Sequence, residues 1–192
     1  MSFWLSREAN TRCEYANNEV YFWLCKRLCR LVKVSMKIEI ARTSDTVELA
    51  RCAKLMASSD PWLTLKRTYS DCLKSLEGNF REVYITRQNT ELLGVMVLQM
   101  QGSFSGYLQS ICVSANMRGL GLGKKMIQFA EERVFKCSPN FFLCVSDFNT
   151  EAIRLYEELG YVRIGEINDF VEKGFHEILM RKTIGSWNEF KK

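Results

Sequence analysis

Residues 107–135 read YLQSICVSANMRGLGLGKKMIQFAEERVF, an order that predicts a strand, a glycine loop and a helix. The first seven residues are apolar and β-branched towards their end, and Gly119, Gly121 and Gly123 then interrupt the run. Apolar residues return at the spacing of one helix face, namely Leu122, Met126, Phe129, Ala130 and Val134. Glycine lets a ligand approach the backbone, and the first turn of a helix carries free N–H groups and a partial positive charge. The stretch therefore predicts an anion-binding loop.

The glycine spacing argues against two common nucleotide loops. A Walker A loop needs four residues between its first Gly and its Gly-Lys pair, whereas three separate Gly119 from Gly123, and Lys125 replaces the required hydroxyl residue. A dinucleotide fingerprint needs two residues between its second and third Gly, but here only Leu122 separates Gly121 from Gly123. The anion is therefore expected to belong to another ligand.

Two motifs together resemble the GNAT acetyltransferase superfamily. The sequence RGLGLG at 118–123 is similar to its (Gln/Arg)-x-x-Gly-x-(Gly/Ala) signature. The sequence NTEAIRLYEELGY at 149–161 resembles its Asn-x-x-Ala-x-x-Leu-Tyr-x-x-x-Gly-(Phe/Tyr) segment. The likeness extends over about residues 37–182 and implies an α/β (α+β) fold, in which helices flank a mixed, twisted central sheet.

The resemblance implies an N-acetyltransferase that moves the acetyl group of acetyl-CoA to a primary amine, by direct attack in a ternary complex. Loop amides would hold the pyrophosphate, and a central strand splayed by a bulge would hold the pantetheine arm. Tyr156 matches the general acid that protonates the thiolate, and Asn149 is both a helix cap and a CoA contact. The implied acetyl-CoA-binding residues are Ile111, Cys112, Val113, Arg118, Gly119, Leu120, Gly121, Leu122, Gly123, Lys124, Asn149 and Tyr156.

The general base is not fixed by the resemblance. Tyr107 and Gln109 stand where some branches of the family carry Glu or His, and neither is a useful base near neutral pH. Cys144 stands where ribosomal-protein N-terminal acetyltransferases carry Glu. Glu82 and Asp147 remain candidates through a water chain, with an ordinary surface charge as the alternative for each. An acetyl-enzyme on a buried cysteine is disfavoured because buried thiols are usually inert.

The acceptor is left open between a small primary amine and a peptide or protein amine, because fold does not fix function. The resemblance makes Trp62, Tyr69, Tyr107 and Gln109 candidates for substrate contact, although Trp62 could equally be a lid packed over the core. The alternative function is a non-catalytic acyl-CoA-binding sensor or interaction module, which the missing base favours and the presence of Tyr156 disfavours.

The remaining strands and helices are predicted from the spacing of apolar residues and from the residues that cap or break helices. Strands are expected at 37–42, 82–87, 92–99 and 140–146, with a final hairpin at 161–167 and 176–182. Helices are expected from the Asp45 cap to about 56, over 64–77, and from the Asn149 cap to Gly160.

Composition indicates one domain, expected at 36–185, followed by a tail at 186–192. Residues 1–35 hold six Lys and Arg against three Asp and Glu, and form either a basic amphipathic helix or a segment outside the native chain; we favour a start at Met36. Their apolar run is too short and interrupted for a membrane span or a signal peptide. The body, with 21 basic against 19 acidic residues, implies no nucleic-acid face.

Eight scattered cysteines without a paired framework indicate reduced thiols and a cytoplasmic location. With a single His in the chain, no metal site is expected. The predicted partner is the amine acceptor, and a homodimer is left open.

Overall fold

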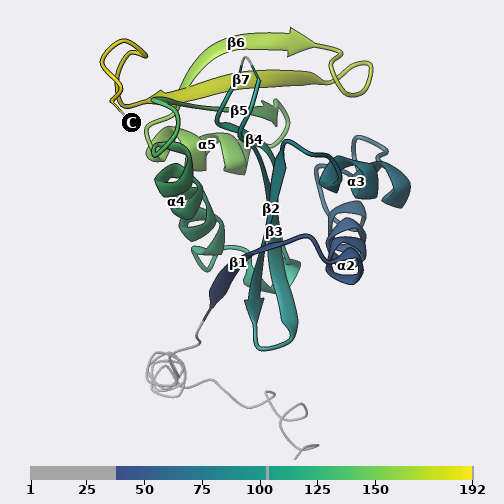
Figure 1. Ribbon diagram of the computed structural model, residues 1–192. Helices are drawn as coiled ribbons and strands as arrows, with labels where there is room; N and C mark the ends of the chain where they lie inside the picture. The colour runs from purple at the N-terminus through teal and green to yellow at the C-terminus, as the bar shows by residue number, and fades with distance from the viewer. Residues whose placement is uncertain (1–37, 103, 192) are drawn as a thin grey trace, which may run out of the picture. The chain divides into compact units, whose positions relative to one another are not determined.

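The computed structural model describes residues 38–102 and 104–191 (Figure 1). The expected extension at 1–35 lies outside the described residues. The elements, in chain order, are β1 (Glu39–Thr43), α2 (Thr46–Ala57), α3 (Tyr69–Leu76), β2 (Arg81–Gln88), β3 (Glu91–Gln99), β4 (Tyr107–Val113), a 3-10 turn (Ala115–Met117), α4 (Leu122–Val134), β5 (Asn140–Ser146), α5 (Thr150–Glu158), β6 (Val162–Asn168) and β7 (His176–Thr183).

The strands form one seven-stranded sheet in the order β1-β2-β3-β4-β5-β7-β6. Strands β1 to β4 pair antiparallel, as do β5, β7 and β6. The two halves meet through a parallel pairing of β4 with β5, and α4 is the connection between those two strands. The sheet is therefore mixed, as the resemblance implies.

The β4–β5 junction opens after a short contact. Its register contains only Tyr107 opposite Phe142 and Leu108 opposite Leu143 among the described residues. On its other edge, β4 pairs Ser110 with Val97 but Leu108 with Leu98, which leaves Gln109 as an extra residue in a bulge. A bulge bends its strand and increases its twist, so β4 and β5 separate beyond this point. The expected bulge is thus present, just before Ile111.

Helices cover both faces of the sheet, with α4 and α5 on one side and α2 and α3 on the other (Figure 1). The first core packs α4 and α5 against side chains of β5 and β7 such as Leu143 and Met180. The second packs α2 and α3 against Val95, Val97 and Cys112. Each face of the sheet is therefore covered by its own apolar cluster.

Most expected strands and helices match within one or two residues, but the helix expected over 64–77 begins only at Tyr69. Thr68 and Asp71 form a reciprocal capping box that fixes this start: the Asp71 amide donates to the Thr68 hydroxyl, and the Thr68 amide donates to the Asp71 carboxylate. Residues 60–66 instead form hydrogen-bonded turns, and Lys66 has a φ of 52°. This segment is a loop beside the candidate site rather than part of α3.

Candidate active site

A cavity of about 1000 Å³ lies where β4 and β5 separate. The strands β4, β5 and β7 contribute to its lining, together with the loop into α4, the start of α5, the loop between α2 and α3, and α3 itself. The loop between β6 and β7 adds Phe170 and Val171. The cavity therefore gathers segments that lie more than 100 residues apart in sequence.

The glycine loop forms one end of this cavity. Gly121 is the N-cap of α4 with a φ of 81°, and Gly119 has a φ of 71°. A Cβ placed on either residue would meet no heavy atom within 4 Å. The Lys125 amide donates to the Gly121 carbonyl, which is the first bond of the helix, while no backbone acceptor is found among the described residues for amides 122–124. Free amides, open space and a helix N-terminus suit an anion such as a pyrophosphate.

Most of the expected acetyl-CoA-binding residues line the cavity. They are Ile111, Cys112, Val113, Arg118, Gly119, Gly121, Leu122, Gly123, Lys124, Asn149 and Tyr156. Leu120 does not line it and is 66% exposed. Beyond Leu108 the outer edge of β4 pairs with no described strand, so its backbone groups are free to bind a ligand in extended conformation.

Tyr156 projects from α5 into the first core and reaches the cavity. The residue is only 5% exposed, and burial raises the pKa of its hydroxyl well above the usual value. The hydroxyl makes no hydrogen bond with a described residue, yet it is not among the fully enclosed unpartnered atoms. Asn149 caps the same helix by accepting from the Ala152 amide at 3.4 Å. Tyr156 is therefore a protonated group with room for a partner.

The face of the cavity on the α2 and α3 side holds three of the four expected substrate contacts, Trp62, Tyr107 and Gln109. Tyr69 lies outside the cavity lining and is 45% exposed. The Gln109 amide nitrogen donates to the Ser75 carbonyl at 3.1 Å, while its amide oxygen is buried without a partner among the described residues. Trp62 lines the cavity and also packs against the second core, an arrangement that is compatible with both of its predicted roles.

Glu82 lies away from the cavity, which corrects its candidacy as the base. Arg133 of α4 holds its carboxylate with hydrogen bonds of 2.7 and 3.0 Å, and the Tyr84 hydroxyl donates to it at 2.8 Å. Burial favours a higher pKa for Glu82, but the bonds from Arg133 and Tyr84 outweigh it and lower the pKa. A carboxylate that is paired with Arg133 and does not line the cavity is a poor candidate for the base.

Asp147 is also absent from the cavity lining, although its neighbours Ser146 and Phe148 are part of it. The side chain is exposed at the end of β5. Burial raises the pKa of the thiols of Cys112 and Cys144, so both are protonated at neutral pH. That state agrees with the expectation that neither forms an acetyl-enzyme.

Glu177 is a cavity residue that the sequence analysis does not single out. It lies on β7 opposite Ser146, is 6% exposed, and accepts a hydrogen bond of 2.5 Å from the Ser146 hydroxyl. Its sequence neighbourhood gives no motif, and only the β5–β7 register brings it beside the cavity. The only hint near it in the sequence is that this charged residue directly precedes Ile178, an apolar residue that the structure shows to be buried.

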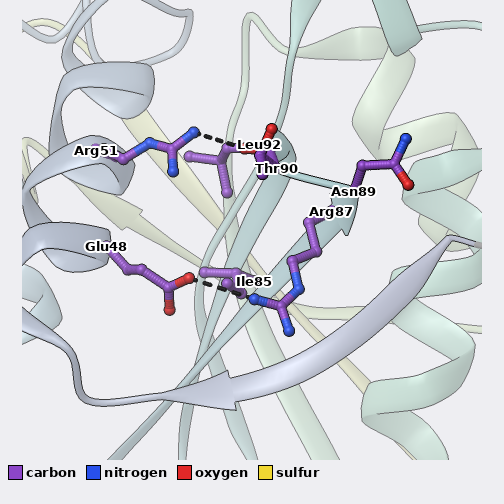
Figure 2. A pocket seen from close by; sticks show the side chains of 7 residues that line it. All are labelled: Glu48, Arg51, Ile85, Arg87, Asn89, Thr90 and Leu92. Atoms are coloured by element: carbon purple, nitrogen blue, oxygen red, sulfur yellow. Dashed lines mark hydrogen bonds and ion pairs between the residues drawn. The ribbon is translucent and has the colours of Figure 1, made fainter.

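A second, smaller cavity of about 150 Å³ lies between α2 and the β2–β3 hairpin (Figure 2). Arg51 donates to the Thr90 carbonyl at 2.9 Å, and Arg87 lies 3.6 Å from the Glu48 carboxylate. Figure 2 shows both arginines turned towards these partners. The charged side chains of this cavity thus link α2 to the β2–β3 hairpin. None of the candidate catalytic residues lines it.

Among residues 38–102 and 104–191, no helix is long and apolar enough to cross a membrane. The same residues contain no group of three or more His, Cys, Asp or Glu side chains placed to hold a metal ion.

Comparisons with solved structures agree with this architecture. The ribosomal-protein-S18-alanine N-acetyltransferase from Escherichia coli superposes with a TM-score of 0.64 at 18% identity, over 81% of this chain and 99% of that one. An aminoglycoside 6'-N-acetyltransferase complexed with coenzyme A gives a TM-score of 0.63 at 17% identity, over 77% of this chain and 98% of that one. These likenesses show a shared fold.

Sequence comparisons lead to the family. The thialysine N-epsilon-acetyltransferases of Mus musculus and Sus scrofa are each 35% identical over 80 residues, which is 41% of this chain. The chain spans about half of the length of these relatives, 47% in each case. A family model described as acetyltransferase (GNAT) family matches residues 44–161. Because this match takes in more than half of the sequence, the chain belongs to the acetyltransferase (GNAT) family.

Proposed function

We propose that this chain is an N-acetyltransferase that moves the acetyl group of acetyl-CoA to a primary amine by direct attack in a ternary complex. The observation that carries the proposal is the opening between β4 and β5, which has the glycine loop at one end and Tyr156 beside it. The solved relatives named above are N-acetyltransferases, and one of them is complexed with coenzyme A.

The loop and β4 together support a CoA ligand. A pyrophosphate at the N-terminus of α4 would accept hydrogen bonds from amides 122–124, beside the cationic side chains of Arg118 and Lys124. The pantetheine arm contains two amide groups, and the unpaired outer edge of β4 offers backbone donors and acceptors to them. In this pose the thioester lies near Ile111 to Val113, within the opening.

Tyr156 supports the leaving-group step. Because burial raises its pKa, the hydroxyl keeps its proton at neutral pH and can donate it to the departing thiolate. The ring is held by an edge contact with Tyr161, with centroids 5.7 Å apart, so the hydroxyl has a fixed position. A positioned donor whose hydroxyl has no acceptor among residues 38–102 and 104–191 fits the role of general acid.

Gln109 supports an amine acceptor. Its buried amide oxygen accepts no hydrogen bond from a described residue, and an unpaired buried acceptor costs about 1–3 kcal/mol. An amine supplies the missing N–H donor on the α2 and α3 side of the opening. The proteins reported above that are named for N-acetylation of thialysine and of aminoglycosides agree with this assignment.

The test uses the purified full chain with acetyl-CoA and a panel of polyamines, amino acids, aminoglycosides and short peptides. Thiol release is followed in real time, and mass spectrometry identifies the acetylated product and the nitrogen that carries it. We expect turnover with at least one amine class. Tight CoA binding with no product across the panel would instead support a non-catalytic acyl-CoA sensor.

We also place the protein in the cytoplasm. The supporting observation is that Cys52, Cys72, Cys112, Cys137 and Cys144 are all free thiols, as expected in a reducing compartment. Fractionation of cells that express the full chain would test this location.

A further inference from the structure

We propose that Glu177 is the group that takes the proton from the acceptor amine. This assignment rests on the proposed acetyl transfer and adds a residue that the family motifs in this sequence do not contain.

The register places Glu177 on the acceptor side of the sheet. Its partner Ser146 and the preceding inward position Cys144 lie on one face of β5, while Leu143 and Val145 lie on the other and join the α4–α5 core. Glu177 therefore faces the side of α2 and α3. Tyr156 comes from the opposite side, on α5. A base and an acid on opposite sides of the opening can serve the amine and the thiolate separately.

The two carboxylate oxygens of Glu177 are not equivalent. Oε1 accepts the Ser146 hydroxyl hydrogen bond, which fixes the orientation of the group. Oε2 makes no hydrogen bond with a described residue and is not among the fully enclosed unpartnered atoms, so it meets the cavity. One oxygen is thus held by the protein while the other is available to a substrate or a water.

The other two carboxylates that line the cavity suit the role less well. Asp60 is exposed, and its Oδ1 accepts hydrogen bonds from the hydroxyl and amide of Thr64 at 2.8 and 3.3 Å. Glu151 is exposed in the first turn of α5, on the side that the cofactor is proposed to occupy. Among the described residues, Glu177 is the one carboxylate that is both buried and in the cavity.

The electrostatic surroundings raise the pKa of Glu177, which makes its carboxylate a stronger base. Burial chiefly raises the pKa of Glu177, the Ser146 hydrogen bond opposes the rise, and the nearby Asp147 carboxylate adds to it. Glu177 in turn raises the pKa of Tyr107 and Cys144, after the larger effect of their own burial, so all three groups are close together. The remaining charged side chains around the cavity are Asp60, Arg67, Arg118, Lys124 and Glu151.

The reaction balances with these two groups. Glu177 takes one proton from the ammonium form of the acceptor, directly or through a water, and later releases it to solvent. The freed lone pair forms the C–N bond, the C–S bond breaks with its electrons on sulfur, and the Tyr156 proton passes to that sulfur. A second proton from the acceptor nitrogen passes through water to the Tyr156 oxygen and restores its hydroxyl. The products are the amide, the free thiol and one proton.

The test compares Glu177→Gln with Glu166→Gln in the full chain, using an amine that the wild type acetylates. Both changes replace a carboxylate by an amide, but Glu166 is exposed on β6 and outside the cavity lining. We expect Glu177→Gln to lower kcat/KM by about 100-fold or more at pH 7, the usual contribution of a general base, and Glu166→Gln to stay within about threefold of wild type.

Two further readouts separate a base from a merely structural residue. In wild type, kcat/KM should rise with pH through a raised carboxyl pKa, and Glu177→Gln should lack that step. Acceptors with a low amine pKa, which are already neutral at pH 7, should lose less activity in Glu177→Gln than strongly basic ones. CoA affinity should not change.

The opposite results would overturn the assignment. If wild type is active and Glu177→Gln keeps its rate and its pH profile, Glu177 is not the proton acceptor and the acetyltransferase activity still stands. An equal loss for acceptors of low and high amine pKa would point to a positioning residue instead. A wild type that binds CoA but acetylates no amine would refute the proposed function itself, and this role with it.

Discussion

Replacing Gly121 by Ala tests the anion-binding role of the glycine loop. Its φ of 81° lies in the left-handed region, where a side chain costs about 1–2 kcal/mol. The added methyl would meet no heavy atom of the described residues within 4 Å, and because Gly121 lines the cavity we expect the methyl to compete with a ligand for the space beside amides 122–124. Losing one charge-assisted amide–phosphate hydrogen bond costs about 1.5–3 kcal/mol, which weakens binding by roughly 10- to 150-fold.

Two other glycines separate strain from ligand contact. Gly174 has a φ of 89° and equally open space, but it lies outside the cavity lining, so Gly174→Ala should lose similar stability and keep its affinity for CoA. At Gly123 a Cβ would lie 3.8 Å from Leu155 and 3.9 Å from Val113, which is ordinary contact. Gly123→Ala should therefore gain up to about 1 kcal/mol in unfolding free energy as a better helix former.

The assay is titration calorimetry with CoA, paired with urea unfolding of each variant. We expect Gly121→Ala and Gly174→Ala to unfold at similar urea concentrations, while only Gly121→Ala loses CoA affinity. If Gly121→Ala binds CoA as tightly as Gly174→Ala, the α4 loop does not hold the pyrophosphate and the cofactor pose is wrong.

Three further predictions concern stability. The lowered pKa of Glu82 means that its bond with Arg133 stabilises the fold above about pH 4.5 and is lost as the pH falls further, so urea unfolding of Glu82→Gln should lack this acid-dependent loss. Glu177 has a raised pKa, so its burial costs nothing below about pH 4.5 and destabilises the fold as the pH rises through the folded value; Glu177→Gln should flatten that decline in the same assay. Gly106→Ala should cost about 2–5 kcal/mol, measured by thermal unfolding, because its φ is 82° and a Cβ would lie 2.6 Å from the Asn140 carbonyl oxygen. Equal pH dependence in a Gln variant and wild type, or a Gly106→Ala protein of normal stability, would contradict the corresponding contact.

Much of the fold follows from local sequence signals. The capping side chains of Asp45 and Asn149 accept amide hydrogen bonds as expected, and Asn89 and Thr90 form the two-residue turn between β2 and β3. These features depend on residues that are neighbours in the chain, so pattern alone can locate them. The start of α3 was harder to predict from the sequence, because the helix-like spacing of apolar residues continues upstream of the Thr68 cap.

The candidate site was only partly predictable, because the sequence pattern locates only those features whose residues are neighbours in the chain. The glycine loop and the Tyr156 segment are contiguous motifs, and the structure brings both to one cavity. The carboxylates depend on partners far away in sequence: Glu82 meets Arg133 across 51 residues, and Ser146 meets Glu177 across 31. Without the strand register, a buried carboxylate facing a cavity cannot be told from one neutralised by an arginine.

The most direct test of the proposed reaction is the turnover of Tyr156→Phe. Phe keeps the ring that packs on Tyr161 and removes only the hydroxyl, so CoA binding and stability should be close to wild type. We expect kcat for acetyl transfer to fall by about 100-fold or more, with an unchanged Kd for CoA. A Tyr156→Phe protein that acetylates its amine at the wild-type rate would contradict the assignment of Tyr156 as the proton donor, and with it the way in which the opening between β4 and β5 is proposed to work.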